Sequence, residues 1–516
     1  MSYVVVATTS GRVRGMSAAG TVRFLGLPYG ASTAGAHRFR PPRPVEPWTG
    51  VRDALEFGPS APQVDVRAGT GPMGRRLLAL LYPRAGHPTE GGPMSEDCLR
   101  LNVWTPAADA GARPVMVWFH GGAFQHGSGN EMAFNGDVLA AAEDVVVVTV
   151  THRLGFLGFC ALDAVAGESF DGSGVAGLLD LVQALEWVRD NVAAFGGDPG
   201  NVTVFGQSGG GMKVATLMAM PAAAGLFHRA IMQSGPGLRA AEPEEGAATA
   251  RRLLGAAGLA PDSARELRGL ELSDLMAVQE RVISESFGDG GTGLDFLESP
   301  MTFGPTRHDR HLPGRLFGAG APEQADGIPV MIGSTTHEMS MMLVDLPGLT
   351  ELDDTAVASF LDGQVPDAAG LVKRYRAPFP DEPAHLLLAR VASDRTFRGG
   401  SYQVADAKAR QSAPVYTYLF DQPTEVLGGA LGSCHSLEIP YVFGTVDRIP
   451  LVGRSGPVGE VSRLMMRAWA RFARTGDPRH DGLPPWPTWD AGHRAMRFGA
   501  GAGVVDALGL APLLQR

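Results

Sequence analysis

Two continuous apolar runs constrain the fold of this chain more than any other feature. The runs at 115–119 (Val-Met-Val-Trp-Phe) and 145–150 (Val-Val-Val-Val-Thr-Val) are rich in β-branched residues and do not alternate with polar ones. This pattern indicates strands that are buried on both faces of a sheet. Apolar residues between 176 and 194 recur instead at helical spacing. Further strand candidates lie at 201–205, 229–233, 328–332 and 415–420, and a further helix is expected from 209 to about 220.

The alternation of strands with helices predicts the fold class. Strands that are separated by helices favour a parallel arrangement, so we predict an α/β fold with a mainly parallel central sheet covered by helices on both faces. The segments 240–281 and 353–398 read as helical and interrupt this rhythm, and we expect them to be insertions over one end of the sheet. No linker-like or repeated stretch divides the 516 residues, which predicts one domain over residues 1–516.

Charge and apolar content argue against several classes of partner. Lys and Arg number 44 against 54 Asp and Glu, a net charge of −10, whereas nucleic-acid binding needs a basic surface. No apolar run approaches the ~18 residues of a membrane span, and the first residues lack the features of a secretory signal. Three cysteines, an odd number, cannot form a disulfide framework. We expect a cytoplasmic protein that binds neither nucleic acid nor membrane.

One Gly-x-Ser-x-Gly sequence lies between a predicted strand and a predicted helix. It runs from Gly206 to Gly210, with Ser208 at its centre. Glycines two positions either side allow a sharp turn that exposes the serine hydroxyl. The amide of Gly209, at the start of the helix, is then placed to stabilise an oxyanion. The pattern indicates a nucleophilic serine, although a glycine-rich turn with a solvated serine fits the same residues.

A second glycine pair, in His120-Gly121-Gly122-Ala123, directly follows the strand at 115–119. Two glycines at that point let the backbone approach a reacting carbonyl closely. The amides of Gly121 and Gly122 are therefore candidate oxyanion donors that would complement the amide after the nucleophile. An ordinary Gly-Gly turn is the alternative interpretation.

A catalytic serine also needs a base and a carboxylate that orients the base. In sheet hydrolases the chain order is serine, acid, histidine. Glu338 follows the strand at 328–332, and His435 stands in a loop after the strand at 415–420. This order permits Ser208, Glu338 and His435, but it permits other choices too.

Two further patterns carry weak functional signals. Residues 172–177 satisfy Gly-x-Gly-x-x-Gly, but the preceding residues 168–171 read as a loop rather than a strand, so we do not expect a dinucleotide site. His308 and His311 form His-x-x-His without a helix signal, a third ligand or a nearby cysteine. We expect them to be surface histidines in an arginine-rich loop, and we expect neither a metal nor a cofactor.

Several sequence blocks, in order along nearly the whole chain, resemble the type-B carboxylesterase family, the α/β-hydrolases that include the cholinesterases and the bacterial para-nitrobenzyl esterases. They include the serine segment at 206–210 and the glycine pair at 121–122, and together the blocks are highly specific. The other blocks are Phe24–Tyr29, Arg38–Pro42, Trp48–Ala54, Ser95–Val103, Arg153–Gly155, Ala184–Val188, Phe195–Pro199, Glu438–Gly444 and Trp486–Trp489.

The resemblance implies an α/β-hydrolase fold and a role for each matching residue. Ser208 would be the nucleophile, Glu338 the acid and His435 the base. Oxyanion donors would be the amides of Gly121, Gly122 and Gly209. Ser234, in Met-Gln-Ser-Gly, would support the triad through hydrogen bonds.

Four positions depart from the family pattern. Gln207 replaces the usual glutamate before the nucleophile, so a buried charge network must be rewired or neutral. Gly209 replaces the usual alanine, and His337 and Met339 replace the usual residues on either side of the acid. Cys98 lacks the partner cysteine that secreted relatives have, which agrees with a reducing compartment.

These residues predict a serine hydrolase. We expect its substrates to be small-molecule carboxylic esters, which it cleaves through an acyl-enzyme. The same mechanism applied to an amide, a carbamate, a thioester or a specialised natural-product ester is an alternative. A non-catalytic binding protein on the same fold is a more remote one. Apolar pocket candidates are Phe124, Phe287, Phe296, Leu297 and Met339, each of which fits plain core as well.

Overall fold

The computed structural model describes residues 2–65, 71–83, 93–287, 302–318, 320–499 and 501–514. Its strands are β1 (Ser2–Thr8), β2 (Gly11–Ala18), β3 (Thr21–Pro28), β4 (Val51–Asp53), β5 (Arg100–Thr105), β6 (Arg113–Phe119), β7 (Val146–Thr151), β8 (Gly197–Gln207), β9 (Arg229–Gln233), β10 (Val330–Thr335), β11 (Val415–Phe420), β12 (Arg494–Phe498) and β13 (Gly503–Asp506).

Its α-helices are α1 (Pro72–Leu81), α2 (Asp137–Glu143), α3 (Gly155–Phe159), α4 (Asp163–Ala166), α5 (Ala176–Asn191), α6 (Gly209–Leu217), α7 (Pro243–Ala256), α8 (Leu272–Phe287), α9 (Ser340–Leu343), α10 (Asp354–Leu361), α11 (Ala368–Arg376), α12 (Ala384–Ser393), α13 (Gly399–Lys408), α14 (Ile439–Phe443) and α15 (Val458–Thr475).

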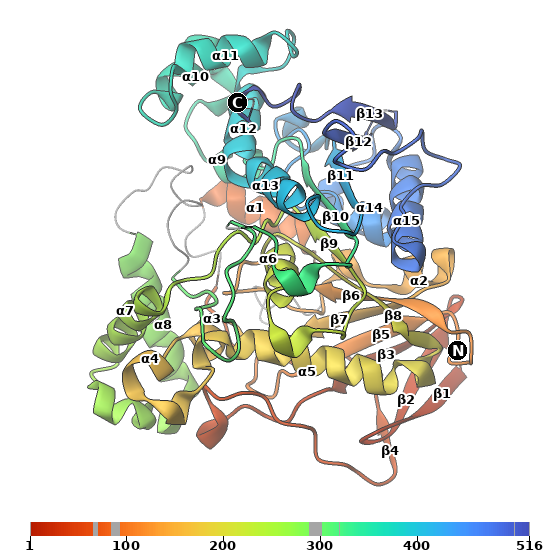
Figure 1. Ribbon diagram of the computed structural model, residues 1–516, viewed down its shortest axis with the longest axis vertical. Coiled ribbons are helices and arrows are strands. Elements are labelled where there is room, and N and C mark those ends of the chain that lie inside the picture. Colours follow the sequence, from red (N-terminus) through yellow and green to blue (C-terminus); the bar gives the residue numbers. More distant parts are fainter. Residues whose placement is uncertain are drawn as a thin grey trace.

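All strands join one sheet, in the order β1-β2-β3-β5-β7-β6-β8-β9-β10-β11-β12-β13, with β4 paired to β2 (Figure 1). The stretch from β7 to β12 in this order is parallel throughout. The predicted mainly parallel sheet is therefore confirmed. Strands β9 and β11 have the predicted bounds, whereas β10 begins two residues later than predicted and extends three residues further.

Both edges of the sheet carry antiparallel strands that the sequence analysis did not identify. β1, β2, β3 and β5 pair antiparallel at one edge, and β13 pairs antiparallel with β12 at the other. The outermost strands β1 and β13 are largely exposed. Exposure does not remove the apolar run from β1, whose residues 3–7 are Tyr-Val-Val-Val-Ala.

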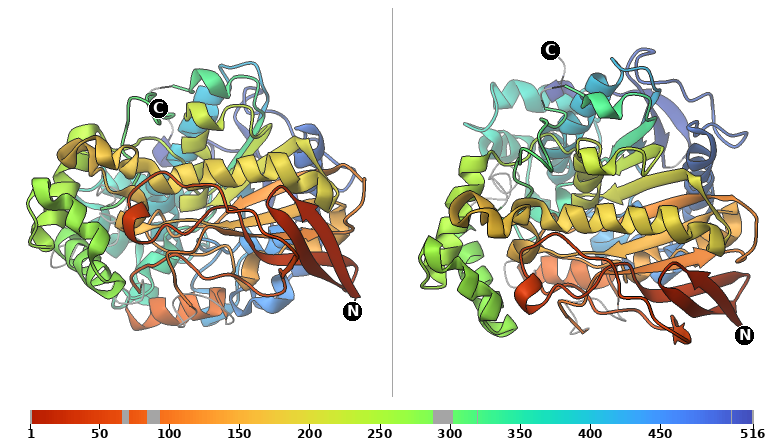
Figure 2. Two further views of the ribbon diagram at one scale, coloured as in Figure 1. Left: turned by 90° about the horizontal axis from the view of Figure 1, so that it is seen from below. Right: turned by 60° about the horizontal axis from the view of Figure 1, so that its bottom comes forward.

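Alternate residues of the central strands pack into two separate hydrophobic cores. On β6, Val115 and Val117 belong to the core that also contains residues of α5. Met116 and Trp118 belong to the other core, which includes Trp469 of α15. Figure 2 shows α5 lying along one face of the sheet. Burial on both faces explains why these strands read as unbroken apolar runs.

The two segments expected to be insertions are helical. The first contains α7 and most of α8, which lie at the lower left of Figure 1, and the second contains α10, α11 and α12, at its top. Helices α10 to α12 build a third core of their own, with Leu371, Tyr375 and Leu387 at its centre.

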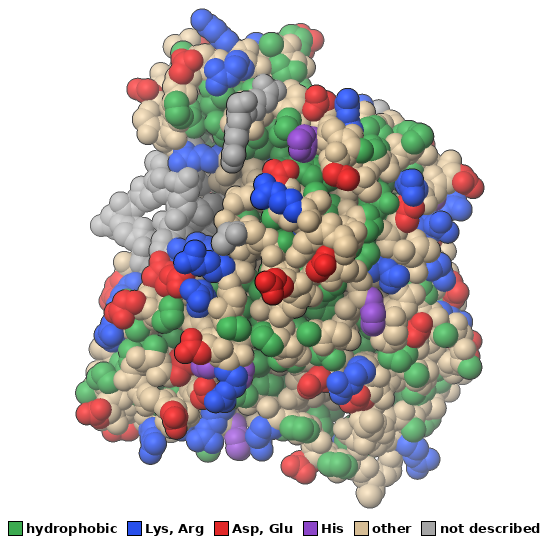
Figure 3. Space-filling model, in the orientation of Figure 1, with side chains coloured by type: hydrophobic (Ala, Val, Ile, Leu, Met, Phe, Trp, Pro, Cys, Tyr) green, Lys and Arg blue, Asp and Glu red, His purple; other side chains and the backbone are tan. Residues whose placement is uncertain are grey.

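Acidic and basic side chains are interspersed over the face shown in Figure 3. Within the described ranges, no helix is both long enough and apolar enough to cross a membrane.

Candidate active site

Ser208 lies in a sharp turn between the end of β8 and the start of α6. Its backbone has φ 54° and ψ −123°, a conformation that side chains rarely adopt and that functional sites often contain. The flanking glycines make the turn possible, because a Cβ on Gly206 would lie 2.5 Å from the carbonyl carbon of Gly210, and one on Gly210 would overlap the carbonyl oxygen of Phe119. Ser208 is only partly buried, so the turn leaves this residue accessible to solvent.

The loop after β6 packs directly against this turn. A Cβ placed on Gly121 would lie 3.5 Å from Cβ of Ser208, and one placed on Gly209 would overlap the backbone of Ala123. Gly122 has φ 83°, in the left-handed region that favours glycine. The structure thus brings the three expected oxyanion donors, Gly121, Gly122 and Gly209, to the immediate surroundings of Ser208. The close approach of Ala123 also explains why residue 209 is a glycine here.

Glu338 and His435 follow neighbouring parallel strands, β10 and β11, and meet beyond their carboxyl ends. His435 Nδ1 lies 2.5 Å from Glu338 Oε2, and the Thr335 amide donates to Glu338 Oε1 at 2.6 Å. Both side chains are buried. Donation from Nδ1 to the carboxylate selects the imidazole tautomer whose Nε2 is an acceptor.

Gln207 contacts the ring of this imidazole. Its Nε2 lies 3.2 Å from His435 Nε2 and 3.4 Å from Nδ1, so the buried amide packs against the ring and is not in line with the lone pair of Nε2. Among the described contacts, the Ser208 hydroxyl makes no hydrogen bond to His435. Catalytic hydrogen bonds are often long or misaligned without substrate. The sequence marked Gln207 as unusual, but only the structure shows that its amide contacts the imidazole.

His337, the residue before the acid, belongs to a buried charged cluster. Its Nε2 lies 2.9 Å from Glu382, which also accepts hydrogen bonds from Arg390 of α12. His337 Nδ1 accepts from the amide of Ser433, in the loop that carries His435. Burial alone would raise the pKa of Glu382, but hydrogen bonds from Arg390 and His337 lower it to about 2. The cluster therefore connects three parts of the site: the turn that carries Glu338, the loop that carries His435, and α12.

The expected supporting role of Ser234 requires a correction. Its hydroxyl is buried and has no hydrogen-bond partner among the described residues, so it does not support the triad through hydrogen bonds. The backbone supports the turn instead, because the Ser208 amide donates to the Gln233 carbonyl at 2.8 Å. The Gln233 side chain donates to Glu438, whose pKa burial and the nearby Glu338 carboxylate raise to about 8.

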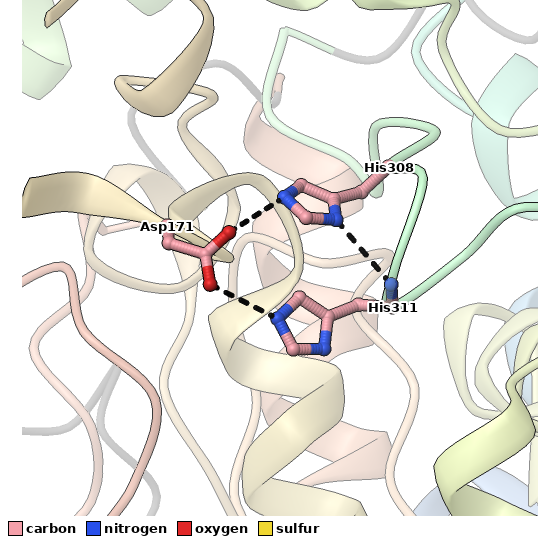
Figure 4. A group of neighbouring side chains, drawn as sticks. All are labelled: Asp171, His308 and His311. Carbon is pink, nitrogen blue, oxygen red and sulfur yellow. Dashed lines mark hydrogen bonds and ion pairs between the residues drawn. The ribbon is translucent and has the colours of Figure 1, made fainter. Parts of the chain in front are cut away.

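His308 and His311 differ from the expectation of two surface histidines without a third ligand. Both are largely buried, and the Asp171 carboxylate contacts both rings from one side (Figure 4), with ligand atoms within 4.8 Å of one another. However, His308 Nδ1 accepts from the amides of Arg310 and His311, which makes Nε2 a donor to Asp171 rather than a metal ligand. Arg310 also pairs with Asp171, at 2.8 Å. These ion pairs and hydrogen bonds connect the loop of Asp171 to the loop of His308, Arg310 and His311.

The pocket candidates divide into core residues and residues that the structure leaves undescribed. Phe124 and Met339 are buried in hydrophobic cores. Phe287 is the last residue of α8, but its side chain lies outside the described residues, as do Phe296 and Leu297 altogether.

Sequence reasoning missed one buried residue beside the oxyanion loop, Lys213 of α6. Its Nζ donates to the His120 carbonyl at 2.9 Å, and the side chain is fully buried. The available signal was a lone lysine on a helix made otherwise of glycine, apolar residues and one threonine.

Comparisons with known proteins agree with this geometry. Residues 2–502 match a family model described as "Carboxylesterase family". The chain is 36% identical over 499 residues to a phenmedipham hydrolase of Pseudarthrobacter oxydans, covering 95% of this chain and 93% of the relative. It is 34% identical over 505 residues to a para-nitrobenzyl esterase of Bacillus subtilis, covering 96% and 94%.

Solved structures give the same result. A carboxylesterase of Geobacillus stearothermophilus is 35% identical, with a TM-score of 0.79 and 97% of both chains covered. An esterase of Clostridium hathewayi is 33% identical, with a TM-score of 0.82, covering 99% of this chain and 98% of the other.

Proposed function

Because the chain belongs to the carboxylesterase family and is a carboxylic ester hydrolase with the α/β-hydrolase fold, we propose that Ser208, His435 and Glu338 carry out the reaction through an acyl-enzyme. The observation that carries this assignment is the hydrogen bond of 2.5 Å between His435 and Glu338, beside the strained turn of Ser208. Three segments far apart in the sequence meet there.

In the acylation step, Ser208 Oγ attacks the ester carbonyl carbon and its proton passes to His435 Nε2. His435 Nδ1 keeps its proton, and the Glu338 carboxylate stabilises the imidazolium that forms. The oxyanion accepts hydrogen bonds from the amides of Gly121, Gly122 and Gly209. Collapse of the intermediate breaks the bond to the alcohol, which takes the proton from Nε2. Water then repeats the sequence on the acyl-enzyme and releases the acid.

Gln207 places a buried, neutral carboxamide beside the imidazole of His435, where the resemblance to the family led us to expect a carboxylate.

Substitution of the nucleophile tests the proposal. We expect Ser208→Ala to abolish turnover of a para-nitrophenyl ester, with a loss of at least about 10⁴-fold, because no nucleophile remains to form the acyl-enzyme. Far-ultraviolet circular dichroism and thermal unfolding check that the fold persists. Most of the activity surviving in this variant would refute the assignment of Ser208.

Covalent labelling separates this proposal from a binding protein on the same fold. An organophosphate should label the wild-type protein at Ser208 and leave Ser208→Ala unlabelled, because only an activated serine displaces the leaving group. A panel of esters with varied acyl and alcohol groups, together with an amide, a carbamate and a thioester, then identifies the bond that is cleaved fastest.

We also propose that the protein acts in a reducing compartment, such as the cytoplasm. This is supported by Cys98, Cys160 and Cys434, which are all free and buried.

A further inference from the structure

A cluster of basic side chains includes two residues of the loop that follows β6. It consists of Lys213 of α6, together with His120, His126 and His152. The rings of His120 and His152 are stacked, with centroids 4.9 Å apart. Both imidazoles donate from Nδ1 to a backbone carbonyl, and both Nε2 atoms are buried without a partner among the described residues.

The strongest contact of this cluster reaches the oxyanion loop through the backbone. Lys213 Nζ donates to the carbonyl of His120 at 2.9 Å. That carbonyl and the N–H of Gly121 belong to the same peptide unit. A donor on the carbonyl oxygen withdraws electron density from the amide, so the N–H at the other end becomes a stronger hydrogen-bond donor. A positive charge on the donor enlarges the effect.

We propose that Lys213 is a positioning residue of the oxyanion hole, which holds and polarises the His120–Gly121 peptide so that the Gly121 N–H binds the developing oxyanion more strongly. The inference rests on the proposed function, because it requires Gly121 to be an oxyanion donor. It assigns a catalytic consequence to a lysine that touches neither the substrate nor the triad.

The surroundings of Lys213 determine how its charge depends on pH. The titratable groups that face it are His120, His126 and His152, and the aromatic ring of Phe124 lies 5.7 Å from Nζ. Burial and the nearby Lys213 lower the pKa of all three histidines, to about 4 for His126. Among the described residues, no carboxylate pairs with Lys213.

Burial lowers the pKa of Lys213 well below its usual value. The ammonium form is therefore present at low pH and is lost as pH rises through this lowered pKa. If the charge supports the oxyanion hole, kcat falls on the alkaline side of the profile.

Lys213→Met tests the role, because methionine fills a similar volume without a donor or a charge. We expect kcat for a para-nitrophenyl ester to fall roughly 10- to 100-fold while KM changes little, since the weakened donor acts mainly on the transition state. The alkaline decline of kcat should also disappear from the profile of this variant.

Lys408→Met is the matched control. Lys408 of α13 is also fully buried, and its Nζ donates to the Ala325 carbonyl at 2.7 Å, before the start of β10. Glu338 follows the other end of this six-residue strand, about 20 Å away at ~3.3 Å per residue. The control should lose thermal stability without a change in kcat.

Lys213→Gln keeps a neutral donor and serves if the methionine variant does not fold. Its kcat should lie between those of the wild type and Lys213→Met, without the alkaline decline.

The inference is overturned if kcat of a folded Lys213 variant equals that of the wild type, or if Lys408→Met lowers kcat equally. Ser208→Ala separates the two proposals: full activity there contradicts the proposed function, whereas an inactive Ser208→Ala beside a fully active Lys213 variant contradicts only the role of Lys213.

Discussion

Individual residues of the site show how neutral and charged groups share one buried space. Glu338 contacts His435 and is proposed to orient it, while burial and Glu338 raise the pKa of the neighbouring Glu438 to about 8. Two carboxylates close together in a buried site do not both ionise readily. A carboxylate at residue 207 would add a third, so the neutral amide of Gln207 limits the repulsion around the base.

Gln207→Glu is expected to move the acid limb of the kcat/KM profile to higher pH, by about one unit. A carboxylate beside His435 stabilises the imidazolium, so the base loses its acceptor at a higher pH than in the wild type. Gln207→Leu removes the amide without adding charge and should leave the acid limb in place. An unchanged acid limb of the kcat/KM profile in Gln207→Glu would show that a charge at residue 207 does not interact with the imidazole of His435.

At the scale of elements, the site depends on loops that are held by one another. Two hydrogen bonds connect the turn after β10, which carries Glu338, to the loop after β11, which carries His435. The Ser433 amide donates to His337 Nδ1, and the His337 amide donates to the Ser433 carbonyl. Arg398, at the junction of α12 and α13, donates to the carbonyls of Thr335 and Thr336 in the turn that carries Glu338. The second helical insertion thus supports the position of Glu338, in addition to covering the sheet.

Glu382→Gln tests this support through pH. The pKa of Glu382 is lowered to about 2 from an ordinary value near 4.5, so its ion pairs stabilise the fold above pH 4.5 and this stability is lost as pH falls toward 2. We expect Glu382→Gln to lower the free energy of unfolding at pH 7 by at most about 3 kcal/mol. The difference from the wild type should shrink steadily below pH 4.5. Denaturant unfolding at several pH values measures this, and a constant difference would contradict it.

For the molecule as a whole, buried ion pairs connect the sheet to the helices that cover it. Arg153 follows β7 and pairs with Asp180 of α5 at 2.6 Å, with both side chains almost fully buried. Arg153 also donates to the carbonyl of Arg40 in the N-terminal segment. One guanidinium therefore joins the sheet, a covering helix and a distant loop.

Arg153→Ala is expected to destabilise the fold by about 3–5 kcal/mol, because the Asp180 carboxylate is left buried without its partner. Urea unfolding measures the change. Arg189→Ala, which breaks the exposed pair between Arg189 and Asp190, is the control and should have little effect. Equal losses in the two variants would mean that burial of the pair is not the cause.

Much of the central sheet and the glycine-flanked turn at Ser208 were predictable from local sequence, whereas Glu338 and His435 were assigned through the resemblance to the family. Strands buried on both faces leave unbroken apolar runs, and the turn at Ser208 needs glycines at fixed positions, so both features are visible without coordinates. The exposed edge strands were not predicted: β13 has only four residues, and the apolar run of β1 was not interpreted as a strand. The absent hydrogen bond of Ser234 and the burial of Lys213 depend on side chains from distant segments, which sequence spacing does not report.

The sequence by itself determined the alternation of strands and helices, the strained serine turn and the glycine pair after β6. These features are local, because each depends on backbone geometry over a few residues. Only the tertiary structure decided that the Gln207 amide packs against the imidazole of His435, that His337 connects two loops to Glu382, and that Lys213 donates to the peptide between His120 and Gly121. Such contacts form between segments up to hundreds of residues apart, so their geometry exists only once the sheet has brought the strand ends together.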